Sequence, residues 1–248
     1  MAAWWEGLFG AEAWQRVQRG WSTVEDTPDQ AARAIEALGL EAGARVLDAP
    51  CGDGRVGLEL AAAGLEVVGV DLVAAFVEAG REAVRRRGLA GRVELRVGDV
   101  RDAVGDEGFD AAVCMWGSFG YFDEAGNLAQ ARAAADALRP GGRYLIDTAS
   151  VETVLPRFRE RTWFRVGDTV VLEERTFALG TGRVETEHTF LRDGAPAESR
   201  RSSVRLYTVH ELTELLREAG FGSFELRDDA LEPFDVGSER LWLVATKG

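Results

Sequence analysis

Three short apolar runs, each ending in an aspartate, constrain the fold of this chain more than any other feature. The aspartates are Asp48, Asp71 and Asp99, and each follows a run rich in Val and Leu. Such runs, separated by stretches with a helical pattern, predict buried strands of a mostly parallel sheet. The carboxyl ends of parallel strands meet at one edge, where open α/β sheets bind ligands. The sequence therefore predicts three carboxylates at one ligand-binding edge.

The alternation of strand and helix extends over the first half of the chain and returns near its end. Strands are predicted at 44–49, 65–71, 92–97, 109–115, 142–147, 221–227 and 240–246. Helices are predicted at 54–63, 73–87, 124–138 and 208–219. Apolar strands joined through amphipathic helices imply right-handed crossovers, and Pro140-Gly141-Gly142 is expected to end one helix and begin the next strand.

The pattern differs in two regions. Residues 169–177, 182–191 and 199–207 read as three strands with short turns between them, which favours an antiparallel insertion. Residues 1–40 look helical and carry Trp4, Trp5, Phe9, Trp14 and Trp21, so they form either ordinary packing or an aromatic lid. A helix is predicted to start with Thr27 as N-cap and Gln30 completing a capping box, and to end at Gly39.

Composition excludes several classes of protein. The formal net charge is −13, so a large polyanionic partner such as a nucleic acid is not expected. The single lysine, Lys247, argues against a phosphate-loop ATPase and against Schiff-base chemistry. Two His and two Cys show no metal-ligand spacing, so no metal is expected and both thiols are expected to be reduced. No membrane span or signal peptide is expected, and the predicted location is cytoplasmic.

The residue types of the three strand ends indicate what they bind. Gly52 and Gly54 follow the first strand and allow a tight turn with bare peptide against a ligand. Asp48 can hold a cationic group, and Asp71 can accept both hydroxyls of a ribose. Asp99 can meet the exocyclic amine of an adenine. Together they predict a site for a nucleoside-bearing cofactor.

The motifs around these residues resemble those of the class I S-adenosylmethionine-dependent methyltransferases. The segment 46–55 is similar to the first motif of that family, 68–72 to the second, 97–100 to the adenine motif and 138–143 to the turn before the fifth strand. The resemblance covers about 41–150 and 208–248. It implies a seven-stranded sheet whose last strand is antiparallel. The chain departs from the family at Pro50, where glycine is common.

The resemblance assigns an expected role to each cofactor residue. Asp48 is expected near the methionine amine, with Gly52 and Gly54 along the methionine part. Asp71 is expected to bind the ribose hydroxyls, and Asp99 and Val100 to frame the adenine. The full set of expected S-adenosylmethionine-binding residues is Asp48, Ala49, Pro50, Gly52, Gly54, Arg55, Asp71, Leu72, Asp99, Val100, Met115 and Trp116.

Candidates for catalysis and for acceptor binding rest on residue chemistry. His188 lies on the more apolar face of a predicted strand and is the sharper candidate base, with Tyr121 second. A His at the rim of a small sheet is the competing structural interpretation, and His210 is expected to be structural. Aromatic side chains can hold a cationic amine, which fits an N-methyltransferase. The expected acceptor-binding residues are Ser118, Tyr121, Phe122, Trp163 and Tyr207.

Three alternatives stay open. A dehydrogenase shares the strand-end acid for ribose, but the Gly-x-Gly-x-x-Gly fingerprint is incomplete here. A hydrolase would need a glycine at Trp116 to form its nucleophile elbow. A protein that binds the cofactor or a partner without turnover is also consistent with the residues.

The sequence thus predicts an α/β protein with a Rossmann-like seven-stranded sheet and a small antiparallel β insertion. Residues 1–40 are expected to form a helical lid, 41–155 and 208–248 the S-adenosylmethionine-binding core, and 156–207 an insertion over the acceptor site. The predicted function is methyl transfer from S-adenosylmethionine to N or O of a small-molecule acceptor, with S-adenosylhomocysteine as the product. A monomer or homodimer is expected.

Overall fold

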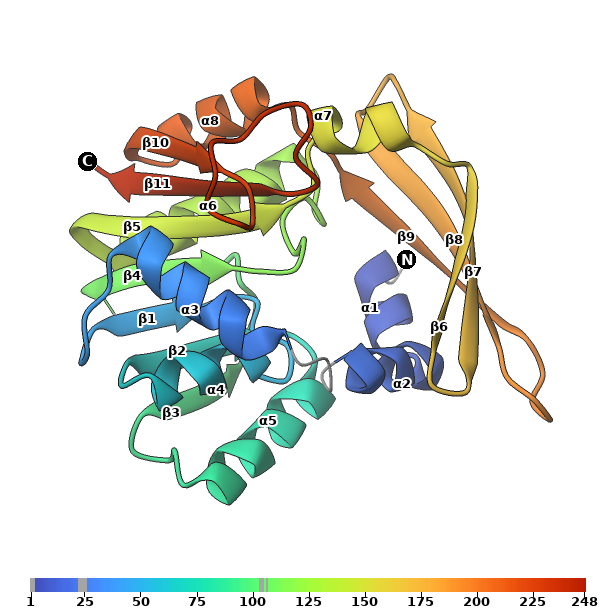
Figure 1. The fold of residues 1–248 in the computed structure, drawn as a ribbon, viewed down its shortest axis with the longest axis horizontal. Coiled ribbons are helices and arrows are strands. Elements are labelled where there is room, and N and C mark those ends of the chain that lie inside the picture. The colour runs from blue at the N-terminus through green and yellow to red at the C-terminus, as the bar shows by residue number, and fades with distance from the viewer. Residues whose placement is uncertain (1–2, 22–25, 103–104, 106) are drawn as a thin grey trace.

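The structure, a computed structural model, contains two β-sheets that stand apart with two short helices between them (Figure 1). It describes residues 3–21, 26–102, 105 and 107–248, and the side chain of Trp21 lies outside the described part. The larger sheet has seven strands and the smaller has four. No helix in the described part of the chain is both long enough and apolar enough to cross a bilayer.

The seven-stranded sheet confirms the predicted fold class. Its strand order is β10-β11-β5-β4-β1-β2-β3. The strands are β1 (Arg45–Asp48), β2 (Glu66–Asp71), β3 (Val93–Val97), β4 (Phe109–Cys114), β5 (Leu138–Thr148), β10 (Phe221–Arg227) and β11 (Leu241–Lys247). The pairs between β1 and its neighbours β2 and β4 are parallel, whereas β11 runs antiparallel to both β5 and β10. The expected antiparallel last strand is therefore present.

Helices cover both faces of this sheet (Figure 1). The helices are α3 (Thr27–Leu38), α4 (Arg55–Ala62), α5 (Ala74–Arg87), α6 (Glu124–Ala137) and α8 (Val209–Glu218). Side chains of α3, α4 and α5 share one apolar cluster with Val46, and side chains of α6 and α8 share another with Leu47. Adjacent residues of one strand thus pack on opposite faces, as the period of two requires. The carboxyl ends of β1 to β4 remain free to face a ligand.

The smaller sheet has one strand more than the sequence predicted. It consists of β6 (Arg161–Val166), β7 (Thr169–Ala178), β8 (Arg183–Leu191) and β9 (Glu198–Arg205), joined in antiparallel order. The prediction missed β6. Its residues alternate between exposed and half-buried, and Val166 pairs with Thr169 across the two-residue loop that Gly167 begins. That alternation and the glycine in the loop are the hairpin signal that the sequence contained.

The first forty residues divide between the two sheets. Helices α1 (Trp4–Phe9) and α2 (Glu12–Trp21) pack against the four-stranded sheet, where Leu8 and Val17 share an apolar cluster with Val171 and Phe190. Helix α3 packs instead on the large sheet through Ala31, Ala34 and Leu38. Only the first two helices are thus in a position to cover a ligand, and their role as a lid stays a prediction.

Two local predictions were wrong in detail. Thr27 is the first helical residue of α3 rather than its N-cap. Among the described residues its hydroxyl has no hydrogen-bond partner and forms no capping box with Gln30. Asp26 is the N-cap but its side chain makes no capping bond. The predicted end at Gly39 is confirmed, with φ of 60°. Strand β5 begins at Leu138 rather than 142, because Leu138 pairs with Phe109 beyond a register shift. The remaining short elements are α7 (Val151–Val154) and η1 (Leu155–Arg157).

Candidate active site

One cavity of about 680 Å³ lies where the carboxyl edge of the large sheet faces α1 and α2. The three strand-end acids all line it. Predicted cofactor residues at its wall are Asp48, Pro50, Gly52, Arg55, Asp71, Leu72, Asp99, Val100, Met115 and Trp116, and predicted acceptor residues are Ser118, Tyr121 and Phe122. A volume of this size is typical of a pocket for a cofactor or drug-sized molecule. The fold therefore brings together most of the residues that the sequence selected.

The loop between β1 and α4 is folded around the carboxylate of Asp71. Asp71 Oδ2 accepts a hydrogen bond from the backbone N–H of Gly52 at 2.8 Å, and Oδ1 accepts one from Val73 at 2.8 Å. Gly52 has φ of 57° and Gly54 has φ of 75°, a region that favours glycine. A Cβ at Gly52 would meet no atom within 4 Å, so the peptide is bare on that side. Each Asp71 oxygen retains a lone pair for a further donor such as a hydroxyl.

Asp48, at the end of β1, is a buried acid with an unsatisfied oxygen. It is 2% exposed, and Oδ2 has no hydrogen-bond partner in the described structure. Burial, followed by the charge of Asp71, raises the pKa of Asp48 to about 8. A buried carboxylate that lacks a cationic partner is costly, and an ammonium group would relieve that cost. The residue fits the amine end of an amino-acid ligand.

Asp99, after β3, is held by an arginine two residues along the chain. Arg101 donates from Nε to Asp99 Oδ1 at 2.9 Å and from Nη2 to Oδ2 at 2.5 Å. The hydrogen bond from this guanidinium holds the pKa of Asp99 below its usual range, so the acid is ionised at neutral pH. An ionised carboxylate at the cavity wall can accept a hydrogen bond from an amine such as that of adenine.

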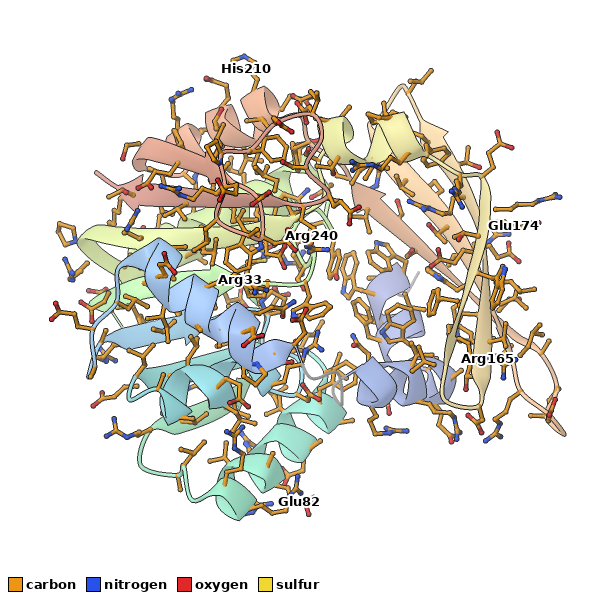
Figure 2. The ribbon with its side chains drawn as sticks, in the orientation of Figure 1. Arg33, Glu82, Arg165, Glu174, His210 and Arg240 are labelled. Atoms are coloured by element: carbon orange, nitrogen blue, oxygen red, sulfur yellow. The ribbon has the colours of Figure 1, made fainter. Side chains whose placement is uncertain are left out.

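The turn after β4 presents an indole to the same cavity. Trp116 adopts φ of 64°, uncommon outside glycine, and Asp147 at the end of β5 accepts its backbone N–H at 2.8 Å. Arg240, which Figure 2 shows beside this edge of the sheet, donates from Nε to Asp147 at 2.6 Å. The guanidinium of Arg55 lies over the indole of Trp116, and its central carbon is 3.8 Å from the ring centroid. Burial lowers the pKa of Arg55.

The opposite wall of the cavity is aromatic. Trp5, Phe9 and Trp14 of α1 and α2 face Tyr121 and Phe122 of the loop after β4. The rings of Trp5 and Phe122 meet edge to face at 5.0 Å, and those of Phe9 and Tyr121 lie 5.6 Å apart. Burial raises the pKa of Tyr121 to about 12. Its hydroxyl is therefore protonated at neutral pH and suits hydrogen bonding better than proton abstraction.

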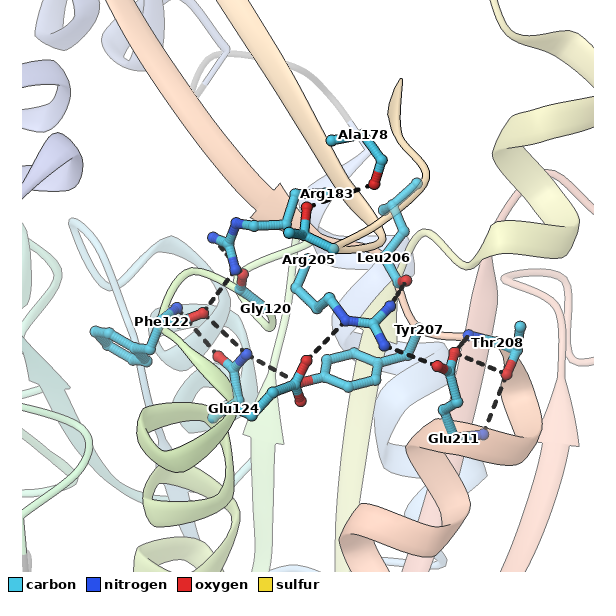
Figure 3. Close-up of polar contacts among 12 residues, drawn as sticks. Gly120, Phe122, Glu124, Ala178, Arg183, Arg205, Leu206, Tyr207, Thr208 and Glu211 are labelled. Carbon is cyan, nitrogen blue, oxygen red and sulfur yellow. Dashed lines mark hydrogen bonds and ion pairs between the residues drawn. The ribbon is translucent and has the colours of Figure 1, made fainter. Parts of the chain in front are cut away.

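The loop that carries Tyr121 and Phe122 is held from behind by the four-stranded sheet (Figure 3). Arg183 of β8 donates to the carbonyl of Phe122 at 2.9 Å and, from Nη2, to that of Tyr121 at 3.3 Å. The backbone N–H of Arg205 donates to the Gly120 carbonyl at 2.8 Å. The peptide groups of the loop are thus satisfied away from the cavity, and its two aromatic side chains are directed into it.

Arg205 links the four-stranded sheet, beside this loop, to the helices of the larger sheet. Its guanidinium forms ion pairs at 2.8 Å with Glu124 of α6 and with Glu211 of α8 (Figure 3). Tyr207, a predicted acceptor residue, belongs to this network, because its hydroxyl donates to Glu124 at 2.7 Å and accepts from Asn127 at 2.9 Å. Tyr207 does not line the cavity, and its contacts give it a structural role.

Two further candidates lie outside the cavity. His188 is buried on the inner face of β8, with Nε2 at 2.9 Å from Ser202 Oγ and Nδ1 at 3.2 Å from Glu173. The indole of Trp14 lies 5.5 Å from the His188 ring and separates it from the cavity. Trp163 is 66% exposed on β6. His210 points outward from α8, as Figure 2 shows. The first-predicted base is therefore one layer away from any ligand.

Three remaining predictions concern the loop after β1, the two cysteines and metal binding. Ala49 and Gly54 belong to the loop at the cavity but do not line it. Cys51 and Cys114 are buried and free, as expected, and burial raises the pKa of each thiol. Across the described ranges, no group of three or more His, Cys, Asp or Glu residues is placed to hold a metal ion.

Sequence reasoning missed Asp147 and Arg101. Asp147 ends the fifth strand as Asp48 ends the first, so the rule that selected three acids would have selected a fourth. Arg101 follows Asp99 by two residues, a spacing that carries no general signal. The aromatic residues of α1 and α2 were named as a possible lid, but the polar cavity residues Gln15 and Gln18 were not singled out, because helix–sheet contacts over a hundred residues apart leave no local pattern.

Comparison with known proteins supplies the family. A family model described as "Methyltransferase domain" matches residues 46–142, which span β1 to the start of β5 and include all three strand-end acids. The match identifies residues 46–142 as a methyltransferase domain, on the Rossmann-like sheet of the class I S-adenosylmethionine-dependent type. The cofactor of this family is S-adenosylmethionine, and the orphaned oxygen of Asp48, the bare peptide at Gly52 and the free lone pairs of Asp71 fit it.

Among curated methyltransferases, the ubiquinone/menaquinone biosynthesis C-methyltransferase UbiE of Geobacter sp. is 33% identical over 131 residues, which are 51% of this chain. The chain spans about half the length of that relative, 54%. Two solved methyltransferases share the fold over nearly the whole chain. CcbJ of Streptomyces caelestis has a TM-score of 0.77 at 21% identity, covering 91% of this chain and 90% of its own. The amino pentose methyltransferase CalS10 of Micromonospora echinaspora has a TM-score of 0.73 at 21% identity, covering 96% of this chain and 98% of its own.

Proposed function

We propose that this methyltransferase transfers a methyl group from S-adenosylmethionine to N or O of a small-molecule acceptor. The observation that carries the proposal is one cavity with the strand-end acids at one end and an aromatic wall at the other. The cofactor, when bound, supplies an electrophilic methyl group on a sulfonium. The protein then contributes mainly alignment and exclusion of water.

The acids of the core would hold the cofactor by its three polar parts. Asp48 would pair with the methionine amine, and Asp71 would accept the ribose hydroxyls through the lone pairs that its backbone partners leave free. Asp99 and the backbone of Val100 would frame the adenine. Gly52 would lie along the methionine part, where a side chain would obstruct the ligand, and Gly54 would shape the loop that carries it.

The aromatic wall would hold the acceptor. Trp5, Phe9, Trp14, Tyr121 and Phe122 surround this end, and aromatic faces attract a cationic amine. Gln15 and Gln18 add amide groups for hydrogen bonds. Two similar proteins are named for an amino pentose and for ubiquinone or menaquinone, which supports a small acceptor without selecting one.

For an amine acceptor no base within the cavity is required, whereas a hydroxyl acceptor must pass its proton to solvent as the bond to the methyl group forms. An amine that is neutral near pH 7 can attack without help, and its proton can pass to solvent after transfer. The Tyr121 hydroxyl is placed to accept or donate a hydrogen bond at the acceptor. His188 would act only through Trp14, which makes it a positioning residue.

The test is calorimetric titration of the protein with S-adenosylmethionine, S-adenosylhomocysteine and NAD in parallel. The proposal expects micromolar binding of the first two and none of NAD. A screen of small amines, amino sugars and phenols then follows, with S-adenosylhomocysteine formation as the signal. A preference for NAD contradicts the assignment of the cofactor. Tight cofactor binding without turnover of any acceptor class favours a binding protein.

A further inference from the structure

Arg101 does not itself line the described cavity, but it contacts Asp99 at one end of the lining and Phe122 in the aromatic wall. Besides its two side-chain bonds to Asp99, it donates its backbone N–H to Asp99 Oδ1 at 2.9 Å. Oδ1 therefore accepts two hydrogen bonds and Oδ2 accepts one. A carboxylate oxygen has two lone-pair sites, so Oδ2 keeps one position for another donor.

The other side of the Arg101 guanidinium contacts the aromatic wall. Its central carbon lies 4.3 Å from the centroid of the Phe122 ring and 6.0 Å from that of Trp5. Phe122 comes from the loop after β4 and Trp5 from α1. One side chain thus touches the acid of β3, the acceptor loop and the covering helix.

The Asp99–Arg101 pair is partly exposed, with side-chain exposures of 21% and 35%. Ion pairs at such positions add little to folding stability. The effect of the pair is on geometry, because the bidentate fork fixes the plane of the carboxylate and leaves one oxygen site open. The same fork fixes the plane of the guanidinium against Phe122.

We propose that Arg101 is a positioning residue that couples the adenine site to the acceptor wall. It sets the Asp99 carboxylate for the adenine amine on one side and holds Phe122 and Trp5 on the other. Cofactor binding and the order of the acceptor wall then reinforce each other through one side chain. The inference rests on the proposed function, since it requires adenine at Asp99.

The test measures calorimetric affinity for two probes, S-adenosylhomocysteine and 5′-methylthioadenosine, which lacks the amino-acid part. Arg101→Met is expected to weaken both by the same factor, about tenfold, since charge-assisted bonds are lost at the adenine end. Arg101→Lys keeps the positive charge but not the two-pronged hydrogen bonding. Its affinity for both probes should lie between those of Arg101→Met and the wild type. Asp48→Asn, at the amine end, should weaken S-adenosylhomocysteine alone.

A matched control lies on β3. Arg96 forms the same two-residue fork with Glu94, at 2.7 and 2.9 Å, but Glu94, unlike Asp99, does not line the cavity. Arg96→Met should bind both probes as the wild type does. Equal affinities in Arg101→Met and the wild type, or equal losses in Arg101→Met and Arg96→Met, overturn the proposal.

A double-mutant cycle tests the coupling itself. Arg101→Met and Phe122→Leu are combined, and the affinity for S-adenosylhomocysteine is expected to deviate at least about threefold from the product of the single effects. Additive effects overturn the link to Phe122. If the wild type binds neither probe, the proposed function fails and this inference falls with it. If the wild type binds both probes and Arg101→Met binds them equally well, this inference fails and the proposed function is unaffected.

Discussion

The two ends of the cavity are built in different ways. At the proposed cofactor end, acids stand at or just beyond the ends of strands of a parallel sheet, and backbone N–H groups of neighbouring loops fix them, as at Asp71. At the acceptor end, aromatic side chains come from two short helices and a loop. A second sheet holds these from behind and adds no side chain of its own to the described lining. Charge and hydrogen bonding characterise the first end, and ring packing characterises the second.

The difference separates two tasks. An adenosyl cofactor presents fixed hydrogen-bonding groups, so rigid strand ends suit it. An acceptor pocket needs shape, which helices packed on a sheet can change without disturbing the strand ends. The two ends meet at Arg101 and at the loop of Tyr121 and Phe122. Substitutions that separate them should therefore affect cofactor binding and wall packing unequally.

The largest effect is expected from Asp71→Ala. This change removes the proposed acceptor of the ribose hydroxyls and also frees the N–H groups of Gly52 and Val73. Affinity for S-adenosylhomocysteine should fall at least about a hundredfold, about 3 kcal/mol, in a calorimetric titration. Asp110→Ala is the control, because Asp110 also accepts a backbone N–H, that of Arg45, but lies near the opposite end of β4. Unchanged affinity in Asp71→Ala would remove the ribose assignment.

A second large effect concerns Asp48 and pH. Burial raises its pKa from 3.8 to about 8, so the folded protein keeps a proton that the unfolded chain releases. The stabilising contribution is therefore full below about pH 4 and is lost as pH rises to about 8. Asp48→Asn should raise the free energy of unfolding of the cofactor-free protein by a few kcal/mol at about pH 8 and by little at about pH 4.

Urea unfolding at several pH values measures this difference. Asp110→Asn serves as a comparison of opposite sign, since the backbone N–H of Arg45, together with Arg139, lowers the pKa of Asp110. It should destabilise the protein above about pH 4. Binding of S-adenosylhomocysteine to the wild type should also release a proton below about pH 8, because the ligand ammonium favours ionised Asp48. A pH-independent gain in Asp48→Asn would contradict the buried-acid explanation.

The junction of the two ends is probed by Gly120→Ala. Gly120 has φ of 95°, and a Cβ there would lie 2.3 Å from the Arg205 carbonyl oxygen. Backbone overlap and strain together should cost about 3 kcal/mol of unfolding free energy. Gly117→Ala shares the positive φ, 71°, but its Cβ meets nothing within 4 Å, so only the strain of about 1–2 kcal/mol is expected. Equal losses in denaturant titrations would show that the contact with Arg205 does not matter.

The smallest effect is expected at Trp163. It is 66% exposed and outside the cavity, so Trp163→Ala should change affinity for S-adenosylhomocysteine and acceptor turnover less than about twofold. Trp5→Ala is the matched comparison within the acceptor wall and should lower turnover. Steady-state rates on an acceptor found by screening measure both. A strong loss of turnover in Trp163→Ala would place the acceptor against the four-stranded sheet instead of in the cavity.

The contrast between the two ends also explains what the sequence could predict. Strand ends are local features, so Asp48, Asp71 and Asp99 could be selected from short runs, and all three line the cavity. The seven-stranded sheet followed from the same periodicity. Asp147 obeyed the same rule as the last residue of the predicted strand 142–147, but it was not selected.

The acceptor end depends on contacts that no local pattern encodes. His188 was correctly placed on the buried face of its strand, but which element covers that face was not predictable. The cover is α2 with Trp14, which precedes His188 by 174 residues. Trp163 and Tyr207 were selected for chemistry alone, and packing put one in solvent and the other in the Glu124 network. Arg183 holds the loop by donating hydrogen bonds to its backbone carbonyl groups, and no side-chain pattern in the sequence reveals such contacts.

The support that Arg183 gives to the acceptor loop has a consequence for protein engineering. Its hydrogen bonds to the loop reach main-chain oxygens, so they do not depend on which side chains stand at positions 121 and 122. A library that randomises these two positions would keep its anchor in every member. Selectivity could be redesigned here while the scaffold that grips the loop remains constant.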